Sequence, residues 1–112
     1  MKASGLRVYG LNAELIARDA MAGFLAAFSE ERPWDVLLLQ EGVKYQSWEP
    51  RVLDGHLIFP IEGAYMRRPL AVIFNEAVSG GVCPETFNTC GSAGGLAAVI
   101  RGEKFYFASG HL

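Results

Sequence analysis

The stretch Asp35–Gly42, DVLLLQEG, decides the fold. Its four consecutive apolar residues, Val36 to Leu39, predict a strand that is buried on both faces. That strand runs directly into Gln40 and Glu41. A carboxylate at the end of a buried strand is costly unless a partner compensates its charge. The sequence therefore raises the question of what holds Glu41.

The residues before this strand predict a βαβ unit. Residues 6–11 (LRVYGL) include β-prone Val8 and Tyr9 and predict a first strand. From residue 13 to about residue 30, apolar side chains recur at three- and four-residue steps, which is typical of an amphipathic helix. A strand, a helix and a strand in this order predict two parallel strands with a right-handed crossover. The carboxyl ends of both strands then lie at the same edge of the sheet.

More strands are expected downstream. Residues 56–61 (HLIFPI) predict a strand that Pro60 either ends or confines to a sheet edge, and residues 70–74 (LAVIF) predict another. Residues 96–100 and 104–109 predict a hairpin closed by a tight turn at Gly102. Segments 44–54 and 78–94 lack a sustained period and predict mostly loop.

Composition sets limits on the class of protein. The chain has 112 residues, of which 51% are hydrophobic and 20% charged, with a formal net charge of −2. These values exclude a disordered chain and a generally basic surface for nucleic acid, so any phosphate binding has to be local. No apolar run reaches membrane-spanning length, and the N-terminus lacks the pattern of a secretory signal, so we expect an intracellular protein. The spacing of Cys83 and Cys90 matches no zinc or redox motif; free thiols are favoured, with a disulfide as the alternative.

Three polar residues, Asn12, Glu41 and His111, each follow directly on a predicted strand. In open sheets the region outside the strand ends is where ligands bind. An amide, a carboxylate and an imidazole converging there could hold Mg²⁺ and a phosphate, with Glu41 supplying the oxygen ligand that Mg²⁺ prefers. The sequence thus indicates a candidate metal and phosphate site at the sheet edge.

Each of these residues also has a structural interpretation. Asn12 could cap a helix that begins at Ala13, and Glu41 could be a surface carboxylate at a strand end. His111, close to Leu112, could be an exposed imidazole without a role. His56 is more typical of a polar residue at the start of a strand than of a ligand. Only the shared location of Asn12, Glu41 and His111 favours the site.

Three short motifs in this chain resemble a known family. LRVYGLN (6–12), an amphipathic helix, DVLLLQE (35–41) and FASGHL (107–112) occur in the order found in the N-terminal half of the endonuclease/exonuclease/phosphatase superfamily, which has the DNase-I-like fold. By this resemblance Glu41 would bind the catalytic Mg²⁺, with Gln40 supporting it. Asn12 would lie beside the metal and the scissile phosphate, and His111 would hydrogen-bond the phosphate or assist the leaving group.

The resemblance implies Mg²⁺-dependent hydrolysis of a phosphoester by in-line attack of an activated water. The substrate is left open among DNA, RNA, a phospholipid and a soluble phosphate. A histidine at the third motif is more similar to the DNase, sphingomyelinase, deadenylase and phosphatase branches than to the apurinic-site nucleases, which commonly have a tyrosine there. The motif edges depart from the family pattern. Ala13 and Glu14 stand where the family often has Asn-Gly, and Gly42 stands where a threonine is common.

The resemblance also implies the fold class: α/β, as part of a four-layer α/β sandwich. Residues 1–112 would be the N-terminal part of a single domain, about one mixed sheet with its flanking helix, and one apolar face of that sheet would be exposed. The family's Asp-x-Asn and Asp-His motifs belong to a C-terminal half and do not occur in this sequence. We therefore expect little or no turnover from this chain alone.

Two alternatives stand beside the hydrolase interpretation. The chain could be a non-catalytic interaction module that recruits a partner through its exposed sheet face, or a degenerate remnant of a retroelement endonuclease. A P-loop fold is excluded, because the glycines of GSAGG (91–95) are not followed by the Lys-Ser/Thr pair that binds phosphate and metal.

Overall fold

The computed structural model describes residues 5–13, 18–40, 50–61, 70–90 and 93–110, with the backbone alone described for residues 18, 83–90, 93–94 and 109–110. It is a small α/β protein with a mixed five-stranded sheet in the order β1-β2-β5-β4-β3 and a second, three-stranded sheet in the order β6-β7-β8. The strands are β1 (Val8–Asn12), β2 (Val36–Gln40), β3 (Arg51–Leu53), β4 (His56–Pro60), β5 (Leu70–Phe74), β6 (Val82–Cys90), β7 (Ala93–Ile100) and β8 (Glu103–Gly110). The helices are α1 (Met21–Glu31), preceded by the 3-10 turn η1 (Arg18–Ala20), and the short α2 (Glu76–Ser79).

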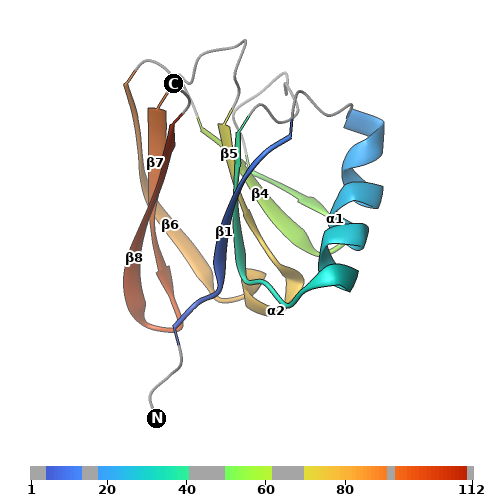
Figure 1. Cartoon of the computed structure of the whole chain (residues 1–112). Helices are drawn as coiled ribbons and strands as arrows, with labels where there is room; N and C mark the ends of the chain where they lie inside the picture. The colour runs from blue at the N-terminus through green and yellow to red at the C-terminus, as the bar shows by residue number, and fades with distance from the viewer. Residues whose placement is uncertain (1–4, 14–17, 41–49, 62–69, 91–92, 111–112) are drawn as a thin grey trace.

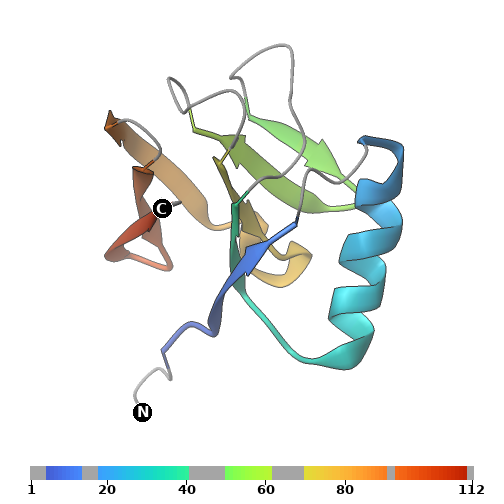
Figure 2. The ribbon, with the colours of Figure 1, turned by 45° about the horizontal axis from the view of Figure 1, so that its top comes forward.

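The expected βαβ unit is confirmed. β1 pairs with β2 in parallel, from Val8 opposite Val36 to Asn12 opposite Gln40, and the other pairs in both sheets are antiparallel. Figures 1 and 2 show three layers, with α1 on one side of the five-stranded sheet and the second sheet on the other side. This arrangement places β2 inside the molecule.

The alternation of side chains along β2 fills two separate cores. Val36 and Leu38 pack between the two sheets, whereas Leu37 and Leu39 pack beneath α1. The helix was expected from residue 13, but α1 begins at Met21, after η1, and residues 14–17 lie outside the described residues. The buried residues of α1, Met21, Leu25 and Phe28, recur at the expected four- and three-residue steps. Burial on both faces explains why the segment reads as an unbroken apolar run.

The chain contains more sheet than the sequence predicted. About one sheet with an exposed apolar face was expected, but the second sheet covers that face, and its Leu96, Ala98, Ile100 and Phe107 complete the core between the sheets. The interaction-module alternative relied on that exposed face, so the structure removes this part of its basis.

Two segments expected to be loops contain regular structure. Residues 78–94 hold part of α2, all of β6 and the start of β7, and residues 44–54 include β3. The glycines at 80, 81, 91 and 94 and the proline at 84 suggested a loop, yet β6 is an edge strand and its register shifts between Pro84 and Thr86. Edge strands and bulges are the places where a sheet tolerates proline.

Two hairpins, β3–β4 and β7–β8, turn on two residues in the left-handed region. Asp54 and Gly55 have φ of 48° and 79°, and Arg101 and Gly102 have φ of 54° and 81°. Two successive positive φ values are the mark of a type I′ turn, whose twist matches that of the flanking strands. The hairpin expected around Gly102 is thereby confirmed, with β7 and β8 longer than predicted.

The two cysteines both lie in β6, seven positions apart. At about 3.3 Å per residue an extended strand separates their Cα atoms by roughly 20 Å, far beyond the span of a disulfide. The alternative of a bond between Cys83 and Cys90 within the chain is therefore wrong.

Among the described residues, no helix is long and apolar enough to cross a membrane.

Candidate metal-binding site

The parallel pair β1–β2 places Asn12, one of the three candidate site residues, opposite Gln40, the residue expected to support Glu41. Asn12 and Gln40 are the last residues of β1 and β2 and lie directly opposite each other. The N–H of Ala13 then donates to the carbonyl oxygen of Gln40 over 2.8 Å, so the ladder continues one residue past β1. Glu41 is the next residue in the chain after Gln40, and its own position lies outside the described residues.

The side-chain alternation assigns Asn12 and Gln40 to one face of the sheet. On β2, Val36 and Leu38 face the second sheet, so Gln40 shares their face. On the neighbouring strand, Tyr9, Leu11 and Ala13 pack on the side of α1, so Asn12 lies on the opposite face, toward the second sheet. Both amides therefore belong to the side of the five-stranded sheet that faces β6, β7 and β8.

The end of β8 lies at the same end of the molecule. β8 contacts β2 across the core between the sheets, and it runs from the β7–β8 turn, at the bottom of Figure 1, toward the end where β1 and β2 finish. His111 follows Gly110, the last residue of β8, and lies outside the described residues. The three strands that precede the candidate residues thus end on one side of the fold.

The interpretation of Asn12 as the cap of the expected helix stays a prediction, because residues 14–17 lie outside the described residues. That helix was to begin at Ala13, but the bond from Ala13 to Gln40 keeps this residue in the sheet. The described helical residues begin at Arg18, and the residue that precedes α1 is Ala20, which makes no side-chain cap bond. Asn12 is exposed at the strand end, where a ligand could reach it.

Two amide side chains, those of Asn12 and Gln40, belong to the described part of the site. Asn12 and Gln40 carry neutral oxygens, and the described residues contain no cluster of three or more His, Cys, Asp or Glu side chains that could hold an ion. Amide and carboxylate oxygens are the hard ligands that suit Mg²⁺. The residues fit Mg²⁺ only if Glu41 adds its carboxylate, so the candidate site depends on that residue.

His56 has a structural role, as the sequence favoured. Its ring stacks on the buried indole of Trp34, with a centroid distance of 5.7 Å and an interplanar angle of 4°. Its Nδ1 lies 3.1 Å from the carbonyl oxygen of Leu53 across the β3–β4 hairpin. Both contacts hold the ring against the protein core.

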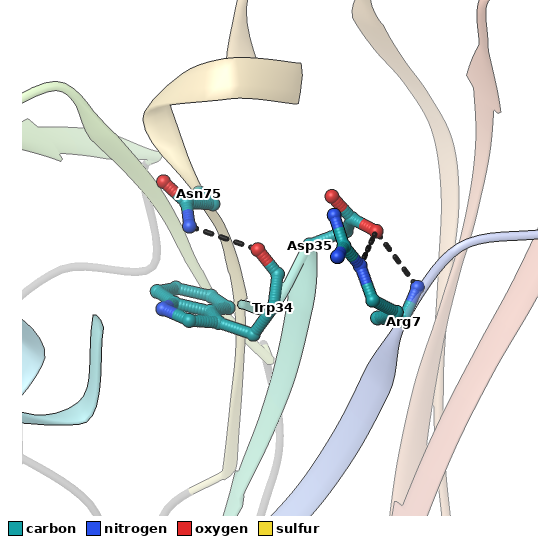
Figure 3. A network of polar contacts seen from close by, with 4 residues as sticks. All are labelled: Arg7, Trp34, Asp35 and Asn75. Atoms are coloured by element: carbon teal, nitrogen blue, oxygen red, sulfur yellow. Dashed lines mark hydrogen bonds and ion pairs between the residues drawn. The ribbon is translucent and has the colours of Figure 1, made fainter. Parts of the chain in front are cut away.

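Sequence reasoning missed a polar network at the other end of β2, which Figure 3 shows. The Asp35 carboxylate accepts a 2.8 Å hydrogen bond from the backbone N–H of Arg7 and lies 3.4 Å from the Nε of the same residue. Asn75, just after β5, donates from its side chain to the carbonyl oxygen of Trp34 over 2.8 Å. The available signal was the charge of Asp35 at the start of a buried strand.

Comparison of the chain with protein-family models found no matching family. A comparison with curated proteins found no match either.

Proposed function

We propose that this chain forms part of a Mg²⁺-dependent phosphoester hydrolase site of the endonuclease/exonuclease/phosphatase type. The observation that supports the proposal most is the parallel register that sets Asn12 opposite Gln40, with Glu41 next in the chain. By the resemblance of the surrounding motifs, Glu41 would bind the metal and Asn12 would lie beside the metal and the phosphate. β8, the strand that precedes His111, ends on the same side of the fold as β1 and β2, and this also supports the proposal.

Each residue of the chain has a distinct task in this proposal. Glu41 holds the metal through its carboxylate, and the neighbouring Gln40 supports that strand end. Mg²⁺, when bound, would neutralise charge on the phosphoryl oxygens. Asn12 orients the scissile phosphate through its amide, and His111 donates a hydrogen bond to a phosphate oxygen or a proton to the leaving oxygen.

We propose further that residues 1–112 are the N-terminal part of a four-layer sandwich. Two stacked sheets with a helix outside the first supply three of its layers, and the proposal assigns the fourth to the outer face of the second sheet, on which Tyr106 is 73% exposed. The resemblance assigns a general base and further contacts to the Asp-x-Asn and Asp-His motifs. Because one carboxylate makes a weak Mg²⁺ site, the chain alone should bind the metal weakly and turn over little or no phosphodiester.

Paramagnetic Mn²⁺, used in place of Mg²⁺, tests the location of the site. In ¹⁵N spectra of the 112-residue chain, substoichiometric Mn²⁺ should broaden the amide signals of Ala13 and Leu39 first. The amides of Asp35 and Glu103 lie toward the other end of the fold and should stay sharp, because the broadening falls steeply with distance.

The variant Glu41→Gln should lose the selective broadening, since it keeps the size of the side chain and removes the charge. Glu103→Gln is the matched control, because Glu103 is exposed and begins β8 at the opposite end. Broadening that persists in Glu41→Gln, or that centres on other residues, would overturn the proposed site.

A further inference from the structure

Asp35 is the one charged side chain that is buried among the residues whose burial the structure describes, with 8% of the residue exposed. It precedes β2, at the end of the strand away from Gln40. The candidate site makes no use of it, and a buried carboxylate is costly unless hydrogen bonds compensate it. Its contacts therefore indicate what the fold gains from it.

These contacts join the start of β2 to the start of β1. The backbone N–H of Arg7 donates to Oδ2 of Asp35 over 2.8 Å, and the backbone N–H of Asp35 donates to the carbonyl oxygen of Arg7 over 2.9 Å. The guanidinium of Arg7 also approaches Oδ2, at 3.4 Å, but that side chain is 57% exposed. Water screens such an ion pair, so the bond to the backbone N–H is the stronger link.

The register of β1 against β2 needs such a link. The two strands are joined by a long connection that includes α1, so no tight turn sets their alignment. The apolar pattern of β2 also distinguishes poorly between the observed register and one shifted by a residue. After such a shift, Val36 and the three leucines that follow it would still fill the two cores. In β1 the exposed and half-buried residues alternate, and none is fully buried.

A shift of one residue would separate the candidate site. Asn12 would no longer lie opposite Gln40, and one of the two amides would turn to the face of α1. The register that unites them depends on the pairing at the other end of the strands, where Arg7 meets Asp35.

We propose that Asp35 is a positioning residue: by binding the backbone N–H of Arg7 it fixes the parallel register that sets Asn12 beside Gln40. This role rests on the proposed function for its biological meaning, but the alignment of the strands can be tested without it. Asn75 provides the contrast, because its side chain donates to the carbonyl oxygen of Trp34 and so ties the end of β5 to the segment before β2, not to β1.

Amide hydrogen exchange separates a register lock from ordinary stabilisation. The N–H of Ala13 reports the far end of the β1–β2 ladder through its bond to Gln40, and the N–H of Ile61 reports the β4–β5 pair through its bond to Leu70. In Asp35→Ala the protection of Ala13 should fall about tenfold more than that of Ile61. In the control Asn75→Ala the two amides should lose protection equally.

Two further variants keep the inference testable if Asp35→Ala does not fold. Asp35→Asn keeps an oxygen that accepts from Arg7 and should show the same selective loss in smaller degree. Arg7→Gln keeps the backbone N–H and should show no selective loss. Equal loss at Ala13 and Ile61 in both Asp35 variants, or a selective loss in Arg7→Gln, would overturn the proposed role.

Mg²⁺ binding distinguishes this inference from the proposed function. If the wild-type chain binds Mg²⁺, Asp35→Asn should weaken the binding and Asn75→Ala should leave it unchanged. If the wild-type chain binds no Mg²⁺, the proposed function fails, and the exchange comparison still decides whether Asp35 sets the register.

Discussion

Asn12 lies directly opposite Gln40 at the ends of two parallel strands, and the ladder continues by one more bond, from the N–H of Ala13 to the Gln40 carbonyl oxygen. This relationship suggests an answer to the question that Glu41 raises. β2, which is buried on both faces, ends at Gln40 with the amide of Asn12 on the neighbouring strand, and Glu41 follows at that point in the chain. A divalent cation there would compensate the carboxylate.

The proposed roles of Glu41 and His111 can be separated with inorganic phosphate. His111→Ala should weaken the binding of phosphate in the presence of Mg²⁺ by about tenfold, the effect of one lost hydrogen bond to a charged group. It should leave stabilisation by Mg²⁺ alone unchanged, because Glu41 is intact. Chemical-shift titrations with phosphate and with Mg²⁺ measure the two effects, and equal loss of both would argue against a separate phosphate role.

Gly55 should resist substitution where Gly10 tolerates it. A Cβ at Gly55 would lie 2.7 Å from Cδ of Glu76, and the residue has φ of +79°, so Gly55→Ala should cost about 1–2 kcal/mol of unfolding free energy. A Cβ at Gly10 meets nothing within 4 Å, and Gly10→Ala should change stability by at most about 0.5 kcal/mol. Urea unfolding of both variants checks the difference, and equal costs would contradict the turn geometry.

Ser29 should stabilise the core through Trp34. The buried indole donates from Nε1 to the Ser29 hydroxyl over 2.9 Å, so Ser29→Ala should lower the unfolding free energy by about 1 kcal/mol. Ser29→Thr keeps the hydroxyl and is the control. Denaturant unfolding followed by tryptophan fluorescence measures both, and an alanine variant as stable as the wild type would contradict a role for this bond.

The sequence predicted the parts of the fold that local pattern controls. The run Val36–Leu39 predicted the buried strand, the helical period predicted α1, and the glycine at 102 predicted the β7–β8 turn. The second sheet was underestimated because β6 carries a proline and adjoins glycines, and edge strands tolerate both when a neighbouring strand supplies the bonds. Pairing between distant segments is absent from any local pattern.

The candidate site was also predictable only in part. Strand ends in a βαβ unit share an edge, so Asn12 was expected beside the end of β2, and the structure sets it opposite Gln40; Glu41 and His111 lie outside the described residues. The role of Asp35 was not predictable, because its partner is a backbone N–H 28 positions away in the chain. Only the three-dimensional pairing of β1 with β2 shows why a charge is buried there.

Whether Glu41 holds a metal is tested most directly by the thermal unfolding of the chain as a function of Mg²⁺ concentration, compared between the wild type and Glu41→Gln, with Glu103→Gln as control. For a dissociation constant of about 1 mM, 10 mM Mg²⁺ should stabilise the wild type by about 1.4 kcal/mol, and the control by the same amount. A melting temperature that rises by several degrees in these two proteins and does not rise in Glu41→Gln is the predicted result. An equal rise in all three, or a rise in none, would contradict a metal site at the end of β2.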